Sequence, residues 1–209
     1  MNRAELKAMA KAQIKGKIGI LFLITLIIGL VPGLLSLIPV VGSIITLLIT
    51  PALALSLIRV YLNVIKGGQP AVGDAFSGTD DFWAAFKVQF LVGLYTFLWS
   101  LLFFIPGIVK GISYSMSMYV LAENKGMSAR ECIKRSQEMT YGHKMELFVL
   151  SLSFIGWAIL GVFTFGLLYI WLMPYMNATF ANAYNELRGV PQAESAPDMS
   201  DFVNSISAE

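Results

Sequence analysis

Side chains that could perform catalysis are few in this sequence, and their spacing matches no common active site. His143 is the only histidine, so a His-based metal site or a Ser-His-Asp triad would depend on that one side chain. Asp80 and Asp81 are adjacent and point apart on a helix, so they do not form an aspartate pair for Mg²⁺. Cys132 is the single cysteine and is interpreted as structural. We therefore expect no enzyme activity, no catalytic residue, no metal and no cofactor.

Polar side chains inside long apolar segments are the better functional candidates. An amide or a charge in hydrocarbon is costly unless it has a partner or a water-filled cavity. The cations among them are expected to extend to the nearest interface, and the asparagines to join helices or line a polar path. The candidate intramembrane polar and packing residues are Arg59, Lys110, Ser113, Ser117, Asn177, Thr179 and Asn182.

Composition and charge distribution indicate the elements that must position these residues. The chain is 56% hydrophobic and only 13% charged, whereas soluble domains carry about 25% charged residues. Residues 18–58 and 147–185 contain no Asp, Glu, Lys or Arg, and residues 88–122 contain only Lys110. A bilayer core is crossed by about 20 helical residues, so each segment is long enough for two spans.

The predicted fold is an all-α membrane protein with six transmembrane helices arranged as three helical hairpins. The hairpins cover residues 17–64, 83–122 and 146–187 of a transmembrane domain at 17–188. We expect turns at residues 38–40, 105–107 and 164–166, where Pro or Gly interrupts a helix. Each span is expected as one helix, and the six helices are expected at roughly 18–38, 41–64, 83–104, 106–122, 146–165 and 166–187.

The two ends of the chain are predicted to lie outside the spans. Residues 1–16 have Leu6, Met9, Ala10 and Ile14 on one face and basic residues on the rest, which predicts an amphipathic interfacial helix in the headgroup plane. Residues 189–209 are polar and are predicted to form a flexible cytoplasmic tail.

The distribution of basic residues predicts the orientation. In the six-span arrangement every Lys and Arg except Lys110 lies on the side of the N-terminus. Positively charged residues stay in the cytoplasm, so both termini are expected there, in a multi-pass protein of the cell membrane. The expected partners are the bilayer, with anionic lipid headgroups on the cytoplasmic face, and a membrane protein or a second copy of the chain. No nucleic-acid partner is expected.

Three tyrosines have similar positions in the hairpins. Tyr61 and Tyr119 each precede a glycine by seven residues, and Tyr61 and Tyr184 each follow a proline by ten. We interpret Tyr61, Tyr119 and Tyr184 as an interfacial aromatic belt at the cytoplasmic ends of the second, fourth and sixth spans. These spans are also rich in Ala, Ser, Thr and Asn, so they are expected to form the centre.

A short cytoplasmic helix is predicted between the second and third hairpins. Ser128-Ala129-Arg130-Glu131 fits a capping box, which predicts a helix over residues 129–139.

The segment from Ser136 to Trp157, SQEMTYGHKMELFVLSLSFIGW, carries a family resemblance. Together with Arg3-Ala-Glu-Leu-Lys7 and the late Pro174-Tyr175, it resembles the bacterial integral-membrane family known as domain of unknown function 975. The resemblance covers roughly residues 3–189. It implies a multi-helix membrane protein of a Gram-positive bacterium and supplies no activity and no catalytic residues.

Three functions are compatible with these patterns. The first is a non-catalytic accessory, scaffold or stress/immunity factor that acts by helix and lipid-headgroup contacts. The second is a small transporter or channel with a polar path between the second, fourth and sixth helices. The third is an enzyme acting on lipid headgroups.

Overall fold

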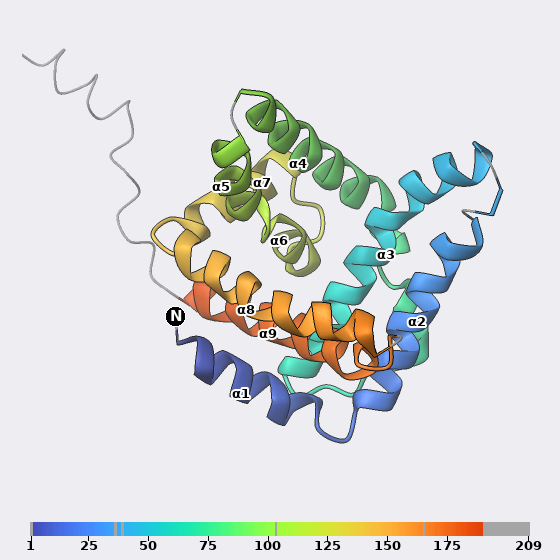
Figure 1. Cartoon of the computed structure of the whole chain (residues 1–209). Helices are drawn as coiled ribbons and strands as arrows, with labels where there is room; N and C mark the ends of the chain where they lie inside the picture. The colour runs from blue at the N-terminus through green and yellow to red at the C-terminus, as the bar shows by residue number, and fades with distance from the viewer. Residues whose placement is uncertain (1, 36, 39, 103, 165, 190–209) are drawn as a thin grey trace, which may run out of the picture.

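The computed structural model describes residues 2–35, 37–38, 40–102, 104–164 and 166–189. All regular structure in these ranges is helical, which confirms the predicted all-α class. Much of the predicted tail, residues 190–209, lies outside the described residues. The elements are α1 (Arg3–Ile14), α2 (Ile18–Leu35), α3 (Val41–Ile65), the short 3-10 helices η1 (Val72–Phe76) and η2 (Thr79–Asp81), α4 (Phe82–Leu102), α5 (Phe104–Tyr114), α6 (Ser117–Glu123), α7 (Ala129–Thr140), α8 (Lys144–Phe163) and α9 (Tyr169–Gly189) (Figure 1).

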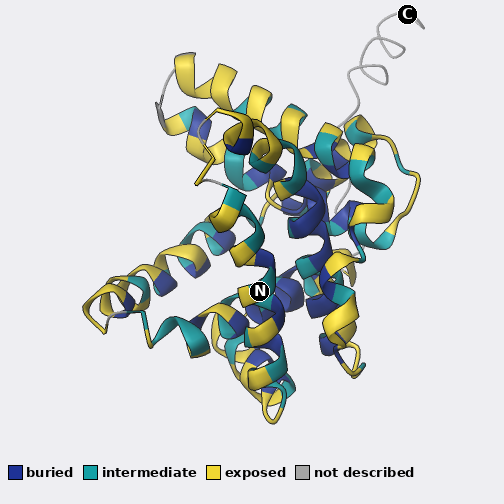
Figure 2. Cartoon of the chain, turned by 90° about the vertical axis from the view of Figure 1, so that its right-hand side faces the viewer, coloured by how far each residue is buried: buried dark blue, intermediate teal, exposed yellow. Residues whose placement is uncertain are grey.

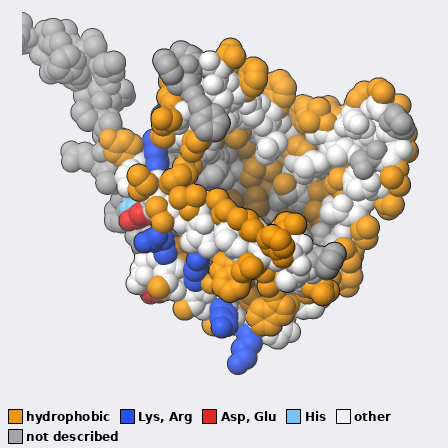
Figure 3. All heavy atoms as spheres, viewed as in Figure 1, with side chains coloured by type: hydrophobic (Ala, Val, Ile, Leu, Met, Phe, Trp, Pro, Cys, Tyr) orange, Lys and Arg blue, Asp and Glu red, His pale blue; other side chains and the backbone are white. Residues whose placement is uncertain are grey.

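Four segments are long and apolar enough to cross a membrane: Ile18–Leu35, Val41–Ile65, Val72–Leu101 and Lys144–Phe163. The rest of the protein covers little of the surface of these four segments. Even in Val41–Ile65, the most buried of the four, only 33% of the most apolar 18 residues are buried. Figure 2 shows exposed residues along most of the peripheral helices, and Figure 3 shows that hydrophobic side chains make up much of the visible surface. Such a surface suits a hydrocarbon solvent, so these segments are compatible with a membrane.

The helix predicted over residues 106–122 is interrupted, so this prediction was wrong. The structure has two shorter helices, α5 and α6, separated at Ser115 and Met116. The interruption is filled from α7: Ser136 Oγ donates to the Ser113 carbonyl at 2.7 Å and accepts from the Met116 amide at 3.2 Å. This hydroxyl satisfies backbone groups that a break in a helix exposes.

The predicted turn at residues 105–107 is also displaced. These residues lie in the first turn of α5, where a backbone amide has no partner inside the helix and Pro106 costs little. The other two predicted turns fall between helices. Residues 38 and 40 lie between α2 and α3, and residues 164 and 166 lie between α8 and α9, with Gly166 at a φ of 85°, while residues 39 and 165 lie outside the described residues.

The centre of the molecule is formed mainly by α3, α6 and α9. Small side chains allow these helices to approach closely. In α3 the buried small residues include Ala52 and Ser56, and in α9 they include Ala178 and Ala181. The prediction that the second, fourth and sixth spans occupy the centre agrees with α3, α6 and α9, whereas α5, the first part of the predicted fourth span, is mostly exposed or half-buried.

Helix α1 packs on the protein through its apolar face. Leu6, Ala10 and Ile14 are at most 1% exposed, and α1 contacts α9 and α3. Figure 1 shows α1 running beside α9, and Figure 3 shows Lys and Arg side chains gathered over the same region. The apolar face that was expected to enter the headgroup region is therefore covered by protein, because other helices offer it an equally apolar environment. Contact of the basic face with headgroups stays a prediction.

The predicted helix between the second and third hairpins is confirmed as α7. Its N-terminus carries the expected capping box: Ser128 Oγ accepts from the Glu131 amide at 3.3 Å, and Glu131 Oε2 accepts from the Ser128 amide at 2.9 Å. These reciprocal bonds fix where α7 begins and so bring Ser136 to the break between α5 and α6.

Candidate functional site

Most candidate polar residues of the spans bond to their own helices. Ser113 Oγ donates to the Val109 carbonyl, Thr179 Oγ to the Tyr175 carbonyl and Asn177 Nδ2 to the Met173 carbonyl, at 2.8 to 2.9 Å. Each acceptor lies four residues earlier in the same helix, so the polar groups are satisfied locally.

Asn182 connects two elements that are far apart in sequence. Its Nδ2 donates to Gln13 Oε1 at 2.6 Å, and Gln13 Nε2 donates back to Asn182 Oδ1 at 3.2 Å. Gln13 Nε2 also donates to the Ile65 carbonyl at 3.4 Å. This reciprocal amide pair joins α1 to α9 and to the end of α3.

Ser117 is the exception among the candidate hydroxyls. It is fully buried at the start of α6, and its Oγ has no hydrogen-bond partner among the described residues. A buried hydroxyl of this kind is uncommon, because it has given up its bonds to water without replacement.

Arg59 and Lys110 have specific partners. Arg59 donates to the Ser77 carbonyl and forms an ion pair with Asp81, so it connects α3 to η2 and the connector before α4. Lys110 Nζ lies 4.8 Å from the centroid of the Trp99 ring, which is a cation–π contact between α5 and α4.

Two of the three tyrosines, Tyr61 and Tyr184, are buried in the protein, and Tyr119 is partly buried, so the interfacial belt stays a prediction. Tyr61 and Tyr184 are 1% and 2% exposed. The rings of Tyr119 and Tyr184 stack with centroids 5.4 Å apart and an interplanar angle of 27°. Each of the three tyrosines lies four or five residues before the C-terminal end of its helix, which is α3, α6 or α9.

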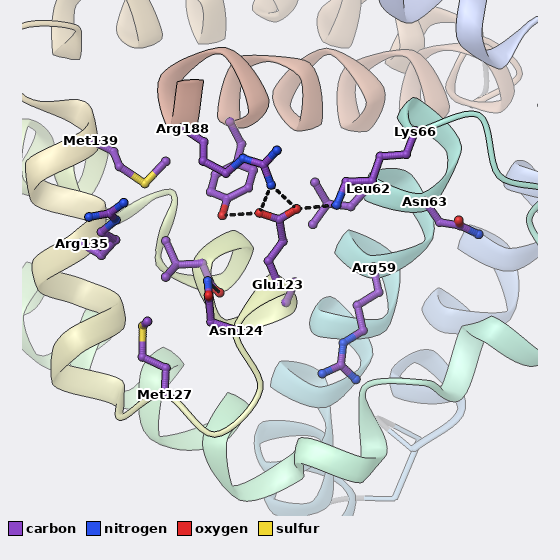
Figure 4. A pocket seen from close by; sticks show the side chains of 13 residues that line it. Arg59, Leu62, Asn63, Lys66, Glu123, Asn124, Met127, Arg135, Met139 and Arg188 are labelled. Atoms are coloured by element: carbon purple, nitrogen blue, oxygen red, sulfur yellow. Dashed lines mark hydrogen bonds and ion pairs between the residues drawn. The ribbon is translucent and has the colours of Figure 1, made fainter. Parts of the chain in front are cut away.

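A cavity of about 690 Å³ lies beyond these tyrosines (Figure 4). Residues of α3, α6, α7 and α9 and of the loop after α6 line it, and they include four cations and one carboxylate. We call this cavity the basic pocket. Its lining residues are Arg59, Leu62, Asn63, Lys66, Val120, Ala122, Glu123, Asn124, Met127, Arg135, Met139, Tyr184 and Arg188.

Glu123 lies in the middle of the basic pocket and holds three helices together. Its carboxylate accepts from Lys66 Nζ at 2.5 Å, from Arg188 Nη1 at 2.7 and 2.8 Å, and from Tyr184 Oη at 2.9 Å (Figure 4). Burial alone would raise the pKa of this carboxyl, but the hydrogen bonds from Lys66, Arg188 and Tyr184 outweigh it, so the pKa lies below its ordinary value. Glu123 is therefore ionised at neutral pH.

A family model described as "Protein of unknown function (DUF975)" matches residues 1–113 and 102–190. The chain belongs to this family. No curated protein and no solved structure gives a significant match. The matched ranges contain every residue that lines the basic pocket, so the pocket lies within the DUF975 region of the chain.

Sequence reasoning missed most of the charged residues of the pocket in this DUF975 protein. A signal was present: Lys66, Glu123 and Arg188 each follow one of the three tyrosines by four or five residues. This spacing places one charged side chain about one helical turn beyond each tyrosine.

The remaining reactive side chains of the DUF975 chain lie outside the pocket lining. His143 Nδ1 contacts Glu146 Oε2 at 2.8 Å at the start of α8. Cys132 is buried, and burial raises the pKa of its thiol to about 11, so it is protonated at neutral pH, as a structural cysteine would be. Within the described ranges, no three His, Cys, Asp or Glu side chains gather as metal ligands would.

Proposed function

We propose that this DUF975 protein is a non-catalytic, multi-pass protein of the bacterial cell membrane. In this proposal it acts as an accessory, scaffold or stress/immunity factor, through contacts with membrane helices and lipid headgroups. The observation that carries the proposal is the closed packing of α3, α6 and α9 next to a pocket lined by basic side chains. Buried small side chains and the Tyr119–Tyr184 stack fill the space between these helices. The accessible charged side chains lie in the basic pocket, at one end of the packed helices.

The proposal includes six spans as three hairpins, with both termini in the cytoplasm. Support comes from the exposed apolar surface of the long helices. It also comes from the distribution of charge, because six spans would place every Lys and Arg except Lys110 on the side of the N-terminus. Beyond the four long apolar segments, α5 together with α6 forms the fourth crossing in this arrangement, and α9 forms the sixth.

Cysteine accessibility tests this topology. In a Cys132→Ala background, Lys134→Cys on exposed α7 should react with a membrane-impermeant maleimide only after the cells are permeabilised. Leu167→Cys, at a position 70% exposed between α8 and α9, should react in intact cells. Labelling of Lys134→Cys in intact cells would refute the orientation. If both cysteines react only after permeabilisation, the third hairpin enters the bilayer without crossing it.

A role without transport is supported by the hydrogen bonds of the polar residues in the spans. Asn177, Thr179 and Ser113 bond to their own helices, and Asn182 bonds to Gln13. Reconstituted protein should therefore conduct no ions and transport no solutes. Flux that is present in proteoliposomes and lost on Asn177→Leu would overturn the proposal in favour of a transporter.

A small transporter or channel is the second candidate. The observation that favours it is the break between α5 and α6, with the unpartnered Ser117 hydroxyl one residue beyond it. Interrupted helices in transporters expose backbone groups that bind ions or substrates. In this chain Ser136 already occupies the backbone groups at the break, which is why we place this function second.

An enzyme acting on lipid headgroups is the third hypothesis. Its side chains would be His143 and Asp81, which have carboxylate and arginine partners, respectively. Turnover of a purified lipid that is abolished by His143→Ala or Asp81→Asn would establish this function.

A further inference from the structure

The basic pocket has the size and position of a binding site for a small anionic group. Its volume of about 690 Å³ falls within the range of pockets that hold small molecules. Lys66 and Arg188 are 50% and 46% exposed, so the pocket is reached from outside the protein. Figure 4 shows Arg188, Lys66 and Glu123 together at the centre, with Arg135 on the α7 side.

The charges of the pocket do not cancel. Arg59 is balanced by Asp81, and Glu123 balances one of the three other cations, Lys66, Arg135 and Arg188. Arg135 forms no ion pair or hydrogen bond with any described residue. An excess of two positive charges therefore faces the pocket, which favours a phosphate group, including the singly charged phosphodiester of a phospholipid.

Interaction with helix dipoles explains the positions of only some of the pocket's cations. Lys66 and Arg188 lie at the C-terminal ends of α3 and α9, where a cation offsets the negative end of a helix dipole. Arg135 lies in the middle of α7, where this effect is absent. Its guanidinium adds two parallel donors to the pocket, the geometry that binds a phosphate most strongly.

The apolar part of the lining favours a lipid as the source of the phosphate. Leu62, Val120, Met127 and Met139 share the pocket with the cations. A free phosphate ion would make no use of these side chains, whereas the glycerol and first methylene groups of a phospholipid would bury apolar area against them.

We propose that the basic pocket binds the phosphate of an anionic lipid headgroup, through Arg135 together with Arg188 and Lys66. Glu123 holds two of these cations in place and competes with the ligand for them. The inference rests on the proposed function, since it names the headgroup chemistry that the protein recognises, but it requires neither a particular topology nor the absence of transport.

Calorimetric titration of the purified full-length chain in an uncharged detergent tests this site. The three ligands are short-chain phosphatidylglycerol, short-chain phosphatidylcholine and inorganic phosphate. Phosphatidylglycerol should bind more tightly than phosphatidylcholine. Arg135→Gln should weaken phosphatidylglycerol binding by about tenfold, because a charge-assisted hydrogen bond is lost. Lys134→Gln removes the same charge from the neighbouring exposed position and should leave binding unchanged. Glu123→Gln should tighten binding, because Lys66 and Arg188 lose their internal anion.

The outcomes separate the two sources of phosphate. Inorganic phosphate that binds as tightly as phosphatidylglycerol, with the same loss in Arg135→Gln, supports the site and assigns it to free phosphate. Equal binding of phosphatidylglycerol and phosphatidylcholine would overturn the proposal. Equal losses in Arg135→Gln and Lys134→Gln would also overturn it, since attraction to the overall charge would then explain the binding. These results are independent of cysteine labelling and flux, so the site and the topology can fail separately.

Discussion

The Ser136 hydroxyl of α7 takes the place of a missing helical turn beside Ser113. It donates to the Ser113 carbonyl at 2.7 Å and accepts from the Met116 amide at 3.2 Å, and all three residues are buried. Thr140 Oγ also lies 3.4 Å from the same carbonyl. One side chain from a separate helix thus stabilises the end of α5 and the start of α6.

Replacing this hydroxyl tests its importance. Ser136→Ala should lower the free energy of unfolding in detergent by about 1 to 3 kcal/mol, because a buried donor and a buried acceptor lose their partner. Ser151→Ala is the matched control, since Ser151 bonds only to the Leu147 carbonyl of its own helix and is exposed. Equal stability of the two variants would show that water or Thr140 replaces the Ser136 hydroxyl.

Local features of this fold could be predicted from the sequence, and features that depend on distant residues could not. The capping box of Ser128 and Glu131 was predictable because both partners lie within one helical turn. The break between α5 and α6 was not, since the residue that fills it, Ser136, lies 23 positions after Ser113. Residues 112–122 contain no proline or glycine that would indicate an interruption at Ser115.

The same reasoning applies to the candidate site and to α1. Lys66 and Arg188 lie 57 and 65 positions from Glu123, so their common spacing after the three tyrosines indicates that they meet only once the helices are known to pack together. For α1 the apolar face was predictable, but its environment was not. Lipid and protein interior are both apolar, and hydrophobic periodicity does not distinguish them.

The packing of α1 gives a second prediction. Leu6 is fully buried and Met9 is 39% exposed on the same short helix. Leu6→Ala should lower the free energy of unfolding by about 2 to 5 kcal/mol, because it leaves a cavity between α1 and its neighbours. Met9→Ala should change it by less than about 0.5 kcal/mol. If α1 lay in the headgroup plane away from the protein, neither variant would alter the unfolding of the remaining helices.

Gly78 gives a third prediction, because its backbone contacts α3 directly. Its amide donates to Ser56 Oγ at 2.8 Å, and a Cβ at this position would lie 2.2 Å from the Ala52 carbonyl oxygen. Gly78→Ala should therefore push the connector away from α3, at a cost of about 1 to 3 kcal/mol. Gly73→Ala is the control in the same connector, since nothing lies within 4 Å of its added Cβ. Thermal unfolding of both variants in one detergent makes the comparison, and similar midpoints would contradict the close contact.

Glu123 gives a prediction with a defined pH dependence. The folded-state pKa of its carboxyl lies below the ordinary value of 4.5, because the hydrogen bonds from Lys66, Arg188 and Tyr184 outweigh the effect of burial. A depressed pKa means that the carboxylate stabilises the fold above the unfolded-state pKa and loses this contribution as the pH falls through the folded-state pKa. Glu123→Gln should therefore be clearly less stable than the parent protein at pH 7, and the difference should shrink below about pH 4.

Unfolding measured across this pH range in both proteins checks the prediction, with Glu138→Gln as the control. Glu138 is an exposed carboxylate of α7 outside the pocket lining, so its replacement should change stability little at any pH. A stability difference for Glu123→Gln that stays constant from pH 7 to pH 3 would contradict an electrostatic role. The carboxylate would then contribute through shape and packing alone, and it would no longer explain how α3, α6 and α9 are held together at the basic pocket.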